Sequence, residues 1–283
     1  MGKIAEPRIL LTGLATGESP RWHEGRLWFC NWGTQEIVAV DLDGSSEVVA
    51  SVPTTLPFCI DWLPDGRMLV VSGPEALLLR LEADGELVPH ADLGGLAGGF
   101  NEIVVDARGN AYVNGGVFDF ATGAGSGIVA LVGPDGSADR VADGIAFGNG
   151  MAITEDGSTL IVAESWARRL SAFDIAEDGG LSNRRVWADL GDSPPDGICV
   201  DAEGAVWFAD VPNKRCVRVR EGGEVLQTIE LDRGCFACML GGPNGRTLFM
   251  LAAEWSGVEN MDDSARNGRL LVAEAPAPGA GRP

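Results

Sequence analysis

Six copies of one short unit recur along the chain, and this repeat constrains the fold more than any other feature of the sequence. Each copy has a short apolar run, a polar turn with a glycine, and a second apolar run rich in Val, Leu, Phe and Trp. The turn glycines are Gly25, Gly66, Gly109, Gly157, Gly204 and Gly245, separated by 41, 43, 48, 47 and 41 residues. Apolar runs joined in this way are typical of β-hairpins, and a period of this length is typical of one propeller blade.

The repeat predicts an all-β fold, a six-bladed β-propeller with four-stranded antiparallel blades around a central channel. Weaker strand pairs such as "CVRVREGGEVLQTIEL" lie between the copies and would supply the outer strands. The alternative is a β-sandwich or a pair of barrels, but neither needs a regular period. We expect one domain over residues 1–283, with "PRILLTG" and "GRLLVAEAP" completing the last blade from both ends and a disordered tail from about 275 to 283.

Composition and charge narrow the possible partners and location. The chain has 40 Gly, which suits many tight turns, and a formal net charge of −20 without a basic run, so a nucleic-acid partner is not expected. The first seven residues lack the apolar core of a signal peptide, and no segment has the roughly 18 apolar residues of a membrane span. We expect a cytoplasmic protein without a membrane partner, whose six irregularly spaced cysteines are reduced.

The first strand of each blade should line the channel, so the residues seven or eight before each turn glycine should meet at its mouth. These residues are Glu18, Cys59, Asn101, Asn149, Asp196 and, in the sixth copy, Ala237 or Cys238. A single Asn or Asp near a strand start is most often a turn residue. Four oxygen-bearing side chains on one axis, however, need a cation or water to satisfy them.

Glu18, Asn149 and Asp196 together predict a site for one divalent metal ion. Hard oxygen ligands with two formal charges suit Ca²⁺ best, with Mn²⁺, Mg²⁺ or Zn²⁺ as alternatives. A zinc site built on histidines is not expected, because the chain has only His23 and His90, in different repeats. For the same reason we expect no Ser-His-Asp arrangement on the axis.

The loops after the second strands should form the rim of the channel and contact a small-molecule substrate. Two of them are long, "NGGVFDFATGAGSG" and "AEWSGVENMDDSARNG". With Trp32, Trp166 and Pro212 they predict an apolar mouth with flexible, glycine-rich lips. The expected substrate contacts are Phe58, Cys59, Phe118, Trp166, Cys238 and Trp255, next to Asn101. The pair Cys235 and Cys238 has C-x-x-C spacing, but its apolar strand and lack of a partner pair favour buried free thiols.

Three motifs give the chain a family resemblance: "GESPRW" with Glu18, "GNGMAITEDG" with Asn149 and "PDGICVDAEGAVW" with Asp196. Over nearly its whole length the sequence resembles the senescence-marker-protein/gluconolactonase family, also called regucalcin-like. The resemblance implies a six-bladed propeller with one axial divalent metal, held by these three residues, and places Asn101 beside the metal to contact substrate or metal-bound water.

The chain departs from the family's usual Arg-x-Asn-Asp pattern, since it has Gly99 and Glu102 at the outer positions. The missing guanidinium removes a rigid fork that would bind a polyhydroxyl compound. The sequence therefore favours a less polar substrate than a sugar-acid lactone, and we expect it near Phe58, Phe100, Phe236 and Trp255.

These features predict a metal-dependent hydrolase that acts on a lactone or a related ester. The metal would polarise the carbonyl and activate water. Asp196 would orient or deprotonate that water while it ligates the metal, and Glu18 is the second candidate base. Two alternatives stay open: hydrolysis of a phosphotriester or aryl ester at the same site, and a calcium- or ligand-binding propeller without catalysis. The sequence leaves the substrate, the physiological metal and the oligomeric state open.

Overall fold

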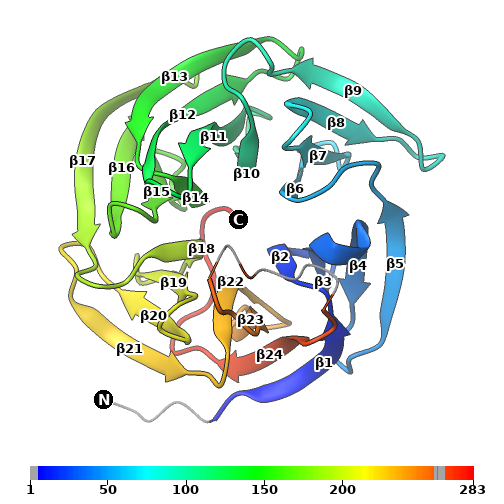
Figure 1. Cartoon of the computed structure of the whole chain (residues 1–283), viewed down its shortest axis with the longest axis vertical. Helices are drawn as coiled ribbons and strands as arrows, with labels where there is room; N and C mark the ends of the chain where they lie inside the picture. The colour runs from blue at the N-terminus through cyan, green and yellow to red at the C-terminus, as the bar shows by residue number, and fades with distance from the viewer. Residues whose placement is uncertain (1–5, 258–259, 261–264) are drawn as a thin grey trace.

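The six repeats form six β-sheets arranged in a ring (Figure 1) in the computed structural model, which describes residues 6–257, 260 and 265–283. Each sheet has four strands that pair antiparallel with their neighbours. The six innermost strands contact one another in succession around the ring. The predicted six-bladed β-propeller is therefore confirmed.

The first three blades follow the chain from the inside of the ring to the outside. Blade one contains β2 (Gly17–His23), β3 (Arg26–Asn31), β4 (Glu36–Val40) and β5 (Ser46–Ser51). Blade two contains β6 (Phe58–Trp62), β7 (Met68–Ser72), β8 (Leu77–Leu81) and β9 (Leu87–Asp92). Blade three contains β10 (Phe100–Val105), β11 (Ala111–Asp119), β12 (Ala124–Val132) and β13 (Ala138–Ile145).

The remaining blades repeat this order, except that blade six takes its outer strand from the other end of the chain. Blade four contains β14 (Gly148–Ile153), β15 (Thr159–Glu164), β16 (Arg169–Ile175) and β17 (Leu181–Asp189). Blade five contains β18 (Pro195–Val200), β19 (Val206–Asp210), β20 (Arg215–Val219) and β21 (Val225–Glu230). Blade six contains β22 (Gly234–Gly241), β23 (Thr247–Ala253), β24 (Gly268–Glu274) and β1 (Arg8–Leu14).

The inner hairpins turn at the predicted glycines. All six adopt left-handed φ angles, between 70° at Gly245 and 87° at Gly109, a conformation that only glycine adopts without steric cost. At Gly25 and Gly66 an added Cβ would meet no other atom within 4 Å. The backbone angle, and not crowding, therefore selects glycine at these two turns.

Burial falls from the inner strands to the outer ones. All five residues of β7 are buried, whereas the outer strand β5 is mostly exposed. An inner strand packs between neighbouring blades on both faces, so nearly all of its residues are buried and it does not alternate between buried and exposed positions. Within the described ranges, the one helix is the three-residue 3₁₀ helix η1 (Trp32–Thr34), and none could cross a membrane.

The ring closes through the pairing of β1 with β24, as the sequence predicts. Arg8 lies opposite Val272 and Leu14 opposite Gly268, in antiparallel order. The first and last strands of the chain therefore share one sheet.

The tail from residue 275 to 283 does not meet the expectation of disorder, because it lies against the ends of three blades, and the C-terminus is at the centre of the ring (Figure 1). Its backbone N–H groups donate to blades six, five and four in turn: Gly279 to Gly245 O (2.8 Å), Ala280 to Val200 O (3.0 Å) and Arg282 to Ile153 O (2.8 Å). A Cβ on Gly281 would lie 2.2 Å from Ile153 O. The small residues that predict disorder are thus what lets the tail lie so close.

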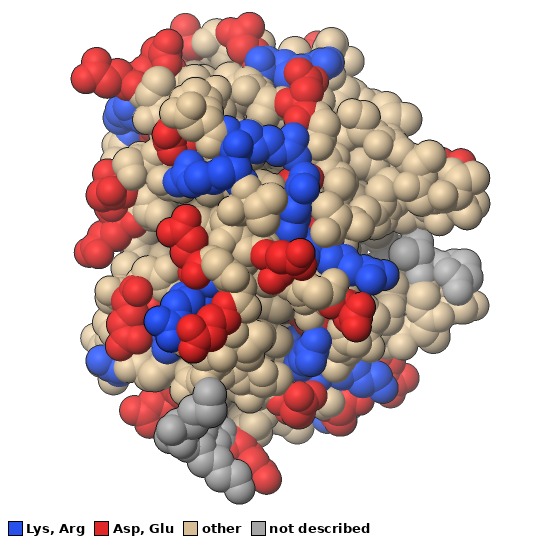
Figure 2. Space-filling model, turned by 90° about the vertical axis from the view of Figure 1, so that its left-hand side faces the viewer, with Lys and Arg blue, Asp and Glu red and all other residues tan. Residues whose placement is uncertain are grey.

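Arginines on the outer wall pair with acidic side chains. Figure 2 shows a band of Lys and Arg side chains, flanked by Asp and Glu, on the side of the ring that carries β17. There Arg185 bonds Asp174 at 2.6 Å, and Arg168 lies 3.5 Å from Asp192. The positive charge of this band is therefore partly neutralised where it lies.

Candidate functional site

The strand register places six equivalent residues at one end of the channel. Each begins the inner strand of its blade: Gly17, Phe58, Gly148, Pro195 and Gly234 lie opposite the last residue of the second strand, and Phe100 lies opposite Gly115 in the longer β11. The residues that follow them are Glu18, Cys59, Asn101, Asn149, Asp196 and Cys235. Blade six differs from the prediction of Ala237 or Cys238, because β22 has eight residues and starts farther from its turn glycine Gly245 than the other inner strands do from theirs.

Three carboxylates from three different blades gather at this end: Glu18, Glu102 and Asp196. Burial raises the pKa of Glu18 well above its usual value, and the charges of Asp196 and Glu102 raise it further. Burial and the charge of Glu102 also raise the pKa of Asp196, whereas a hydrogen bond with the Asn149 side chain lowers it. Carboxylates held this close need protons or a cation to offset their repulsion.

The donor set of Glu18, Asn149 and Asp196 fits a hard divalent cation. Glu18 is 4% exposed, and its Oε2 accepts a hydrogen bond from the Ser19 N–H at 3.1 Å. Asp196 and Asn149 are half-buried. Among the described residues no three His, Cys, Asp or Glu side chains are grouped as a metal would require, so the ion would depend on the Asn149 amide oxygen as well. Carboxylate and amide oxygens are the ligands that Ca²⁺ prefers.

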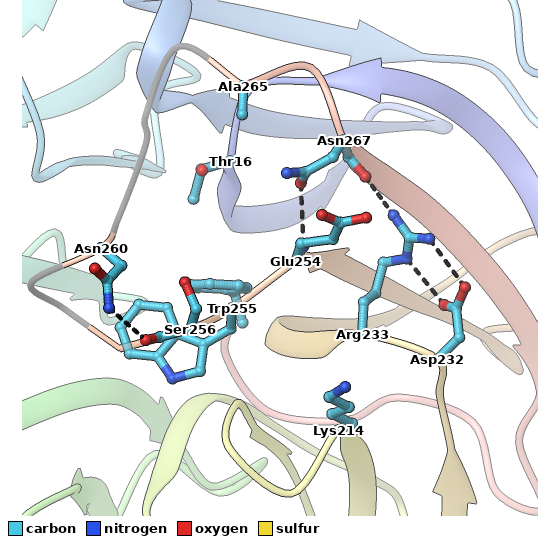
Figure 3. A pocket seen from close by; sticks show the side chains of 11 residues that line it. Thr16, Lys214, Asp232, Arg233, Glu254, Trp255, Ser256, Asn260, Ala265 and Asn267 are labelled. Atoms are coloured by element: carbon cyan, nitrogen blue, oxygen red, sulfur yellow. Dashed lines mark hydrogen bonds and ion pairs between the residues drawn. The ribbon is translucent and has the colours of Figure 1, made fainter.

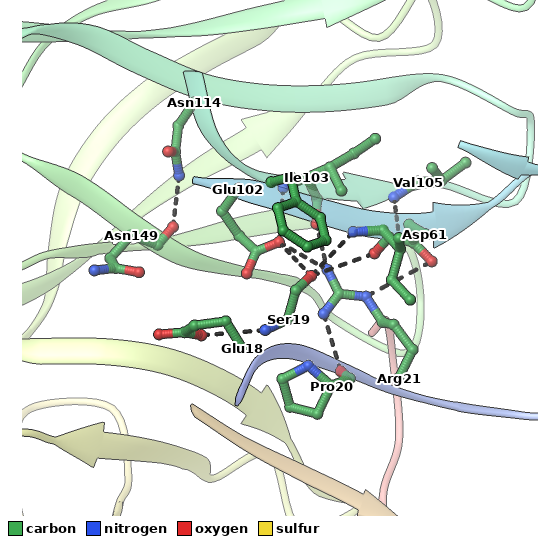
Figure 4. A network of polar contacts seen from close by, with 12 residues as sticks. Glu18, Ser19, Pro20, Arg21, Asp61, Glu102, Ile103, Val105, Asn114 and Asn149 are labelled. Carbon is green, nitrogen blue, oxygen red and sulfur yellow. Dashed lines mark hydrogen bonds and ion pairs between the residues drawn. The ribbon is translucent and has the colours of Figure 1, made fainter. Parts of the chain in front are cut away.

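A buried arginine lies behind the carboxylates and links blades one, two and three. The Arg21 Nη2 donates to Glu102 Oε1 at 3.1 Å and to Ile103 O at 2.6 Å, and its Nε lies 3.8 Å from Asp61 Oδ1 (Figure 4). Ser19 Oγ donates to the same Glu102 oxygen at 3.1 Å. This arrangement fixes Glu102 and neutralises part of its charge.

Two asparagines of blade three hold the first residues of blade four in place. Asn101 Nδ2 donates to Gly148 O at 3.1 Å, and Asn114 Nδ2 donates to Asn149 O at 2.5 Å. Asn114 is completely buried. The backbone of the candidate ligand Asn149 is therefore positioned by the neighbouring blade.

A cavity of about 570 Å³ opens between blades five, six and one (Figure 3). Phe236, next to the axial position of blade six, lies edge-to-face with Trp255 in its wall, with ring centroids 5.8 Å apart. Lys214 and Arg233 also line it, and Arg233 is bound by Asp232 at 2.9 Å. Thr16, two residues before Glu18, lines the cavity too, whereas Glu18, Glu102 and Asp196 do not. Part of the predicted rim loop, residues 258–259 and 261–264, lies outside the described residues.

Four aromatic side chains, here called the mouth cluster, lie at the same end of the channel beside blades three and four. They are Phe118, Phe120, Phe147 and Trp166. Phe118 and Trp166 are sequence-predicted contacts, and Phe120 and Phe147 are additions. The lip that carries Phe118 is a regular hairpin and not a flexible loop, because β11 and β12 pair without interruption as far as Asp119 and Ala124.

Other predicted contacts lie in the core. Phe58 is fully buried and Cys238 is 2% exposed, with its thiol 3.6 Å from Gly197 O. Phe100, expected near the substrate, is 2% exposed. Cys59 is buried too, and its side chain bonds Glu102. All six cysteines are free and buried, which confirms the prediction of reduced thiols.

Arg21, Asp61, Asn114 and Phe147 were missed from the sequence. An arginine within the apolar strand "SPRWH" is the one signal that pointed to a buried charge network. Its partner Glu102 is 81 residues away in the chain, so only the blade arrangement brings the two together.

Comparisons with known proteins identify the family and match the fold. A family model described as "SMP-30/Gluconolactonase/LRE-like region" matches residues 16–254. Regucalcin from Danio rerio is 30% identical over 159 residues. This match covers 54% of this chain and 54% of regucalcin, so the chain spans about half the length of that relative. Two solved structures share the fold at TM-scores of 0.80 and 0.74: a calcium-binding protein, regucalcin, from Agrobacterium tumefaciens (20% identity, 99% of this chain and 96% of that one) and a gluconolactonase from Xanthomonas campestris (21%, 97% and 96%).

Proposed function

Because the chain belongs to the SMP-30/gluconolactonase/LRE-like family, we propose that it is a divalent-metal-dependent hydrolase of a lactone or a related ester. One observation carries the proposal: Glu18, Asn149 and Asp196 converge from blades one, four and five. The relatives named gluconolactonase and calcium-binding protein support the substrate class and Ca²⁺ as the ion.

The different burial of Asp196 and Glu18 suits them to different roles in the reaction. A bound divalent cation supplies Lewis-acid polarisation of the ester carbonyl. Asp196 is half-buried and is oriented by its hydrogen bond to Asn149, so it can hold the attacking water and accept its proton. Glu18 is almost fully buried, which suits a ligand better than a base. Asn101, whose side chain donates to Gly148 O, would contact the substrate.

The substitution Asp196→Asn tests the two roles of this carboxylate. We expect lactone turnover to fall by a factor of about 10² or more, as for loss of a general base, and calorimetry to show weaker Ca²⁺ binding because a charged ligand is lost. Asp192→Asn is the matched control, since Asp192 is 98% exposed in the same segment, and it should retain both. Normal turnover in Asp196→Asn would rule out its assignment as the base.

A substrate panel separates the proposal from its alternatives. The protein is assayed on lactones, aryl esters and phosphotriesters, with Ca²⁺, Mn²⁺, Mg²⁺ or Zn²⁺ and after chelation. Lactone turnover that chelation abolishes and Ca²⁺ restores is the expected result. Turnover confined to phosphotriesters, or tight Ca²⁺ binding without any turnover, would favour the other two interpretations. The cytoplasmic location and the lack of nucleic-acid or membrane partners stay predictions from composition.

A further inference from the structure

The rings of the mouth cluster have a defined mutual geometry. Phe147 and Trp166 are stacked, with centroids 5.2 Å apart and planes at 25°. Phe118 lies edge-on to both, at 5.0 and 5.4 Å, with interplanar angles of 87° and 83°. Phe120 also lies edge-on to both, at 5.2 and 5.9 Å. Offset-stacked and edge-to-face contacts are the preferred ones between aromatic rings, so the four rings form one ordered apolar wall.

Glycines of the hairpin make room for Phe118. A Cβ on Gly116 would lie 2.5 Å from the Phe118 ring, and one on Gly125 or Gly127 would lie 2.7 or 3.0 Å from it. The ring therefore rests directly against the hairpin backbone. The glycine-rich sequence of this lip is explained by the placement of one aromatic side chain.

Phe147 connects the cluster to the candidate metal ligand. It adopts a left-handed φ of 55°, which is strained for a bulky residue and is often found at functional sites. Ser165 N donates to Phe147 O at 3.0 Å and fixes this turn. Asn149 follows two residues later, so the aromatic wall begins next to the axial site.

The rings of the mouth cluster are not fully buried in the protein core. Phe120 is 52% exposed, and the other three rings are half-buried. Position 99, next to Asn101, is a glycine and adds no polar side chain there. An aromatic surface beside polar axial groups is suited to a ligand with one planar apolar part and one polar reacting part.

We propose that the mouth cluster is a subsite for an aromatic ring fused or attached to the lactone or ester of the substrate. This inference rests on the proposed function for the reacting group, but the binding it describes is separate from turnover. The ring of the substrate would lie against Phe118 and Phe120 while its carbonyl faces Asp196 and Asn149.

A pair of non-hydrolysable lactams tests the subsite without catalysis. The lactam 3,4-dihydroquinolin-2-one carries a fused benzene ring, and δ-valerolactam has the same lactam ring without it. Calorimetry of the full chain with Ca²⁺ should show tighter binding of the fused lactam. Phe118→Ala and Phe120→Ala should each weaken that binding about five- to tenfold, the range of one aromatic contact, and should change binding of δ-valerolactam less than twofold.

Two further variants test whether weaker binding comes from the loss of the ring contact or from a general disturbance of the β11–β12 hairpin. Gly116→Ala keeps every ring but should displace Phe118, because the added Cβ would lie 2.5 Å from the Phe118 ring, so it should weaken binding of the fused lactam as Phe118→Ala does. Val117→Ala alters the opposite face of the same strand, where Val117 is 69% exposed, and should bind both lactams normally. Equal losses for both lactams, or no loss in either phenylalanine variant, would overturn the subsite. Selective binding of the fused lactam without hydrolysis of dihydrocoumarin, the matching lactone, would instead reject only the hydrolase function.

Discussion

Replacing Arg21 by methionine should destabilise the protein strongly, because it leaves two buried carboxylates without their cation. The side chains of Arg21 and Glu102 are 6% and 8% exposed, and that of Asp61 is 12% exposed. Removing one partner of a buried ion pair typically costs about 3–5 kcal/mol. Methionine keeps much of the volume of the arginine stem, so the cost should come from the unpaired charges and not from a cavity.

The expected shift in melting temperature follows from the size of the protein. The entropy of unfolding is about 2.1 cal/mol/K per residue, or about 0.6 kcal/mol/K for 283 residues. A loss of about 3–5 kcal/mol therefore lowers Tm by roughly 5–8 °C. Calorimetry with metal removed by chelation measures this shift, and urea unfolding checks the free energy.

The double variant Arg21→Met, Glu102→Gln tests the electrostatic cause. Removing the charge of Glu102 should recover a large part of the lost stability, because the main unpaired carboxylate is then neutral. Added Ca²⁺ should raise Tm more in Arg21→Met than in the unmodified protein, since the cation would offset the unpaired charge. A single variant within 1 kcal/mol of the unmodified protein, or a double variant that loses the sum of both effects, would refute this reasoning.

Three other predictions concern stability and reactivity. Burial acts to raise the pKa of Glu164, but hydrogen bonds from Arg169, Ser171 and Ala146 outweigh it and hold the pKa below its usual value. The stabilisation from this carboxylate is present above about pH 4.5 and is lost as the pH falls through the folded pKa. The difference in Tm between the unmodified protein and Glu164→Gln should therefore shrink in acid. Deleting residues 275–283 should lower Tm and speed amide exchange at Ile153 and Ala202, whose N–H groups donate to carbonyls of the tail; an unchanged Tm would show that the tail adds nothing. Thiol reagents should label none of the six buried cysteines until the protein unfolds. Burial also raises the pKa of five of these thiols well above its usual value, which keeps them protonated and unreactive: Cys30, Cys59, Cys199, Cys216 and Cys238. Rapid labelling of the folded protein would contradict the structure.

The six-fold repeat determined which residues of the fold and the candidate site could be predicted from the sequence. Counting from a turn glycine fixes the position of a residue along its strand, which is why Glu18, Asn149 and Asp196 were found together. The same count failed in blade six, because β22 has eight residues and begins farther from its turn glycine than the other inner strands do. The count also cannot tell which side of an inner strand faces the channel, since residues on both sides are buried, and Phe58, a predicted substrate contact, lies in the core.

Contacts between blades were the part that could not be predicted. The Arg21 network and the mouth cluster join residues far apart in the chain, and their geometry depends on how neighbouring sheets pack. The tail shows a further limit of composition, because Ala, Gly and Pro indicate disorder only when no surface is available for the backbone to bind.

The pairing of β1 with β24 also sets an order of events during synthesis. The ribosome makes β1 first, yet the strand that completes its sheet is finished only when residue 274 has been added. The hairpins of blades one to five can pair as they emerge, but the ring cannot close until β24 is available to pair with β1. Until then β1 exposes unpaired backbone groups that could join a foreign strand. The emergence of β24 is therefore the step at which the ring can close and β1 is protected from pairing with a foreign strand.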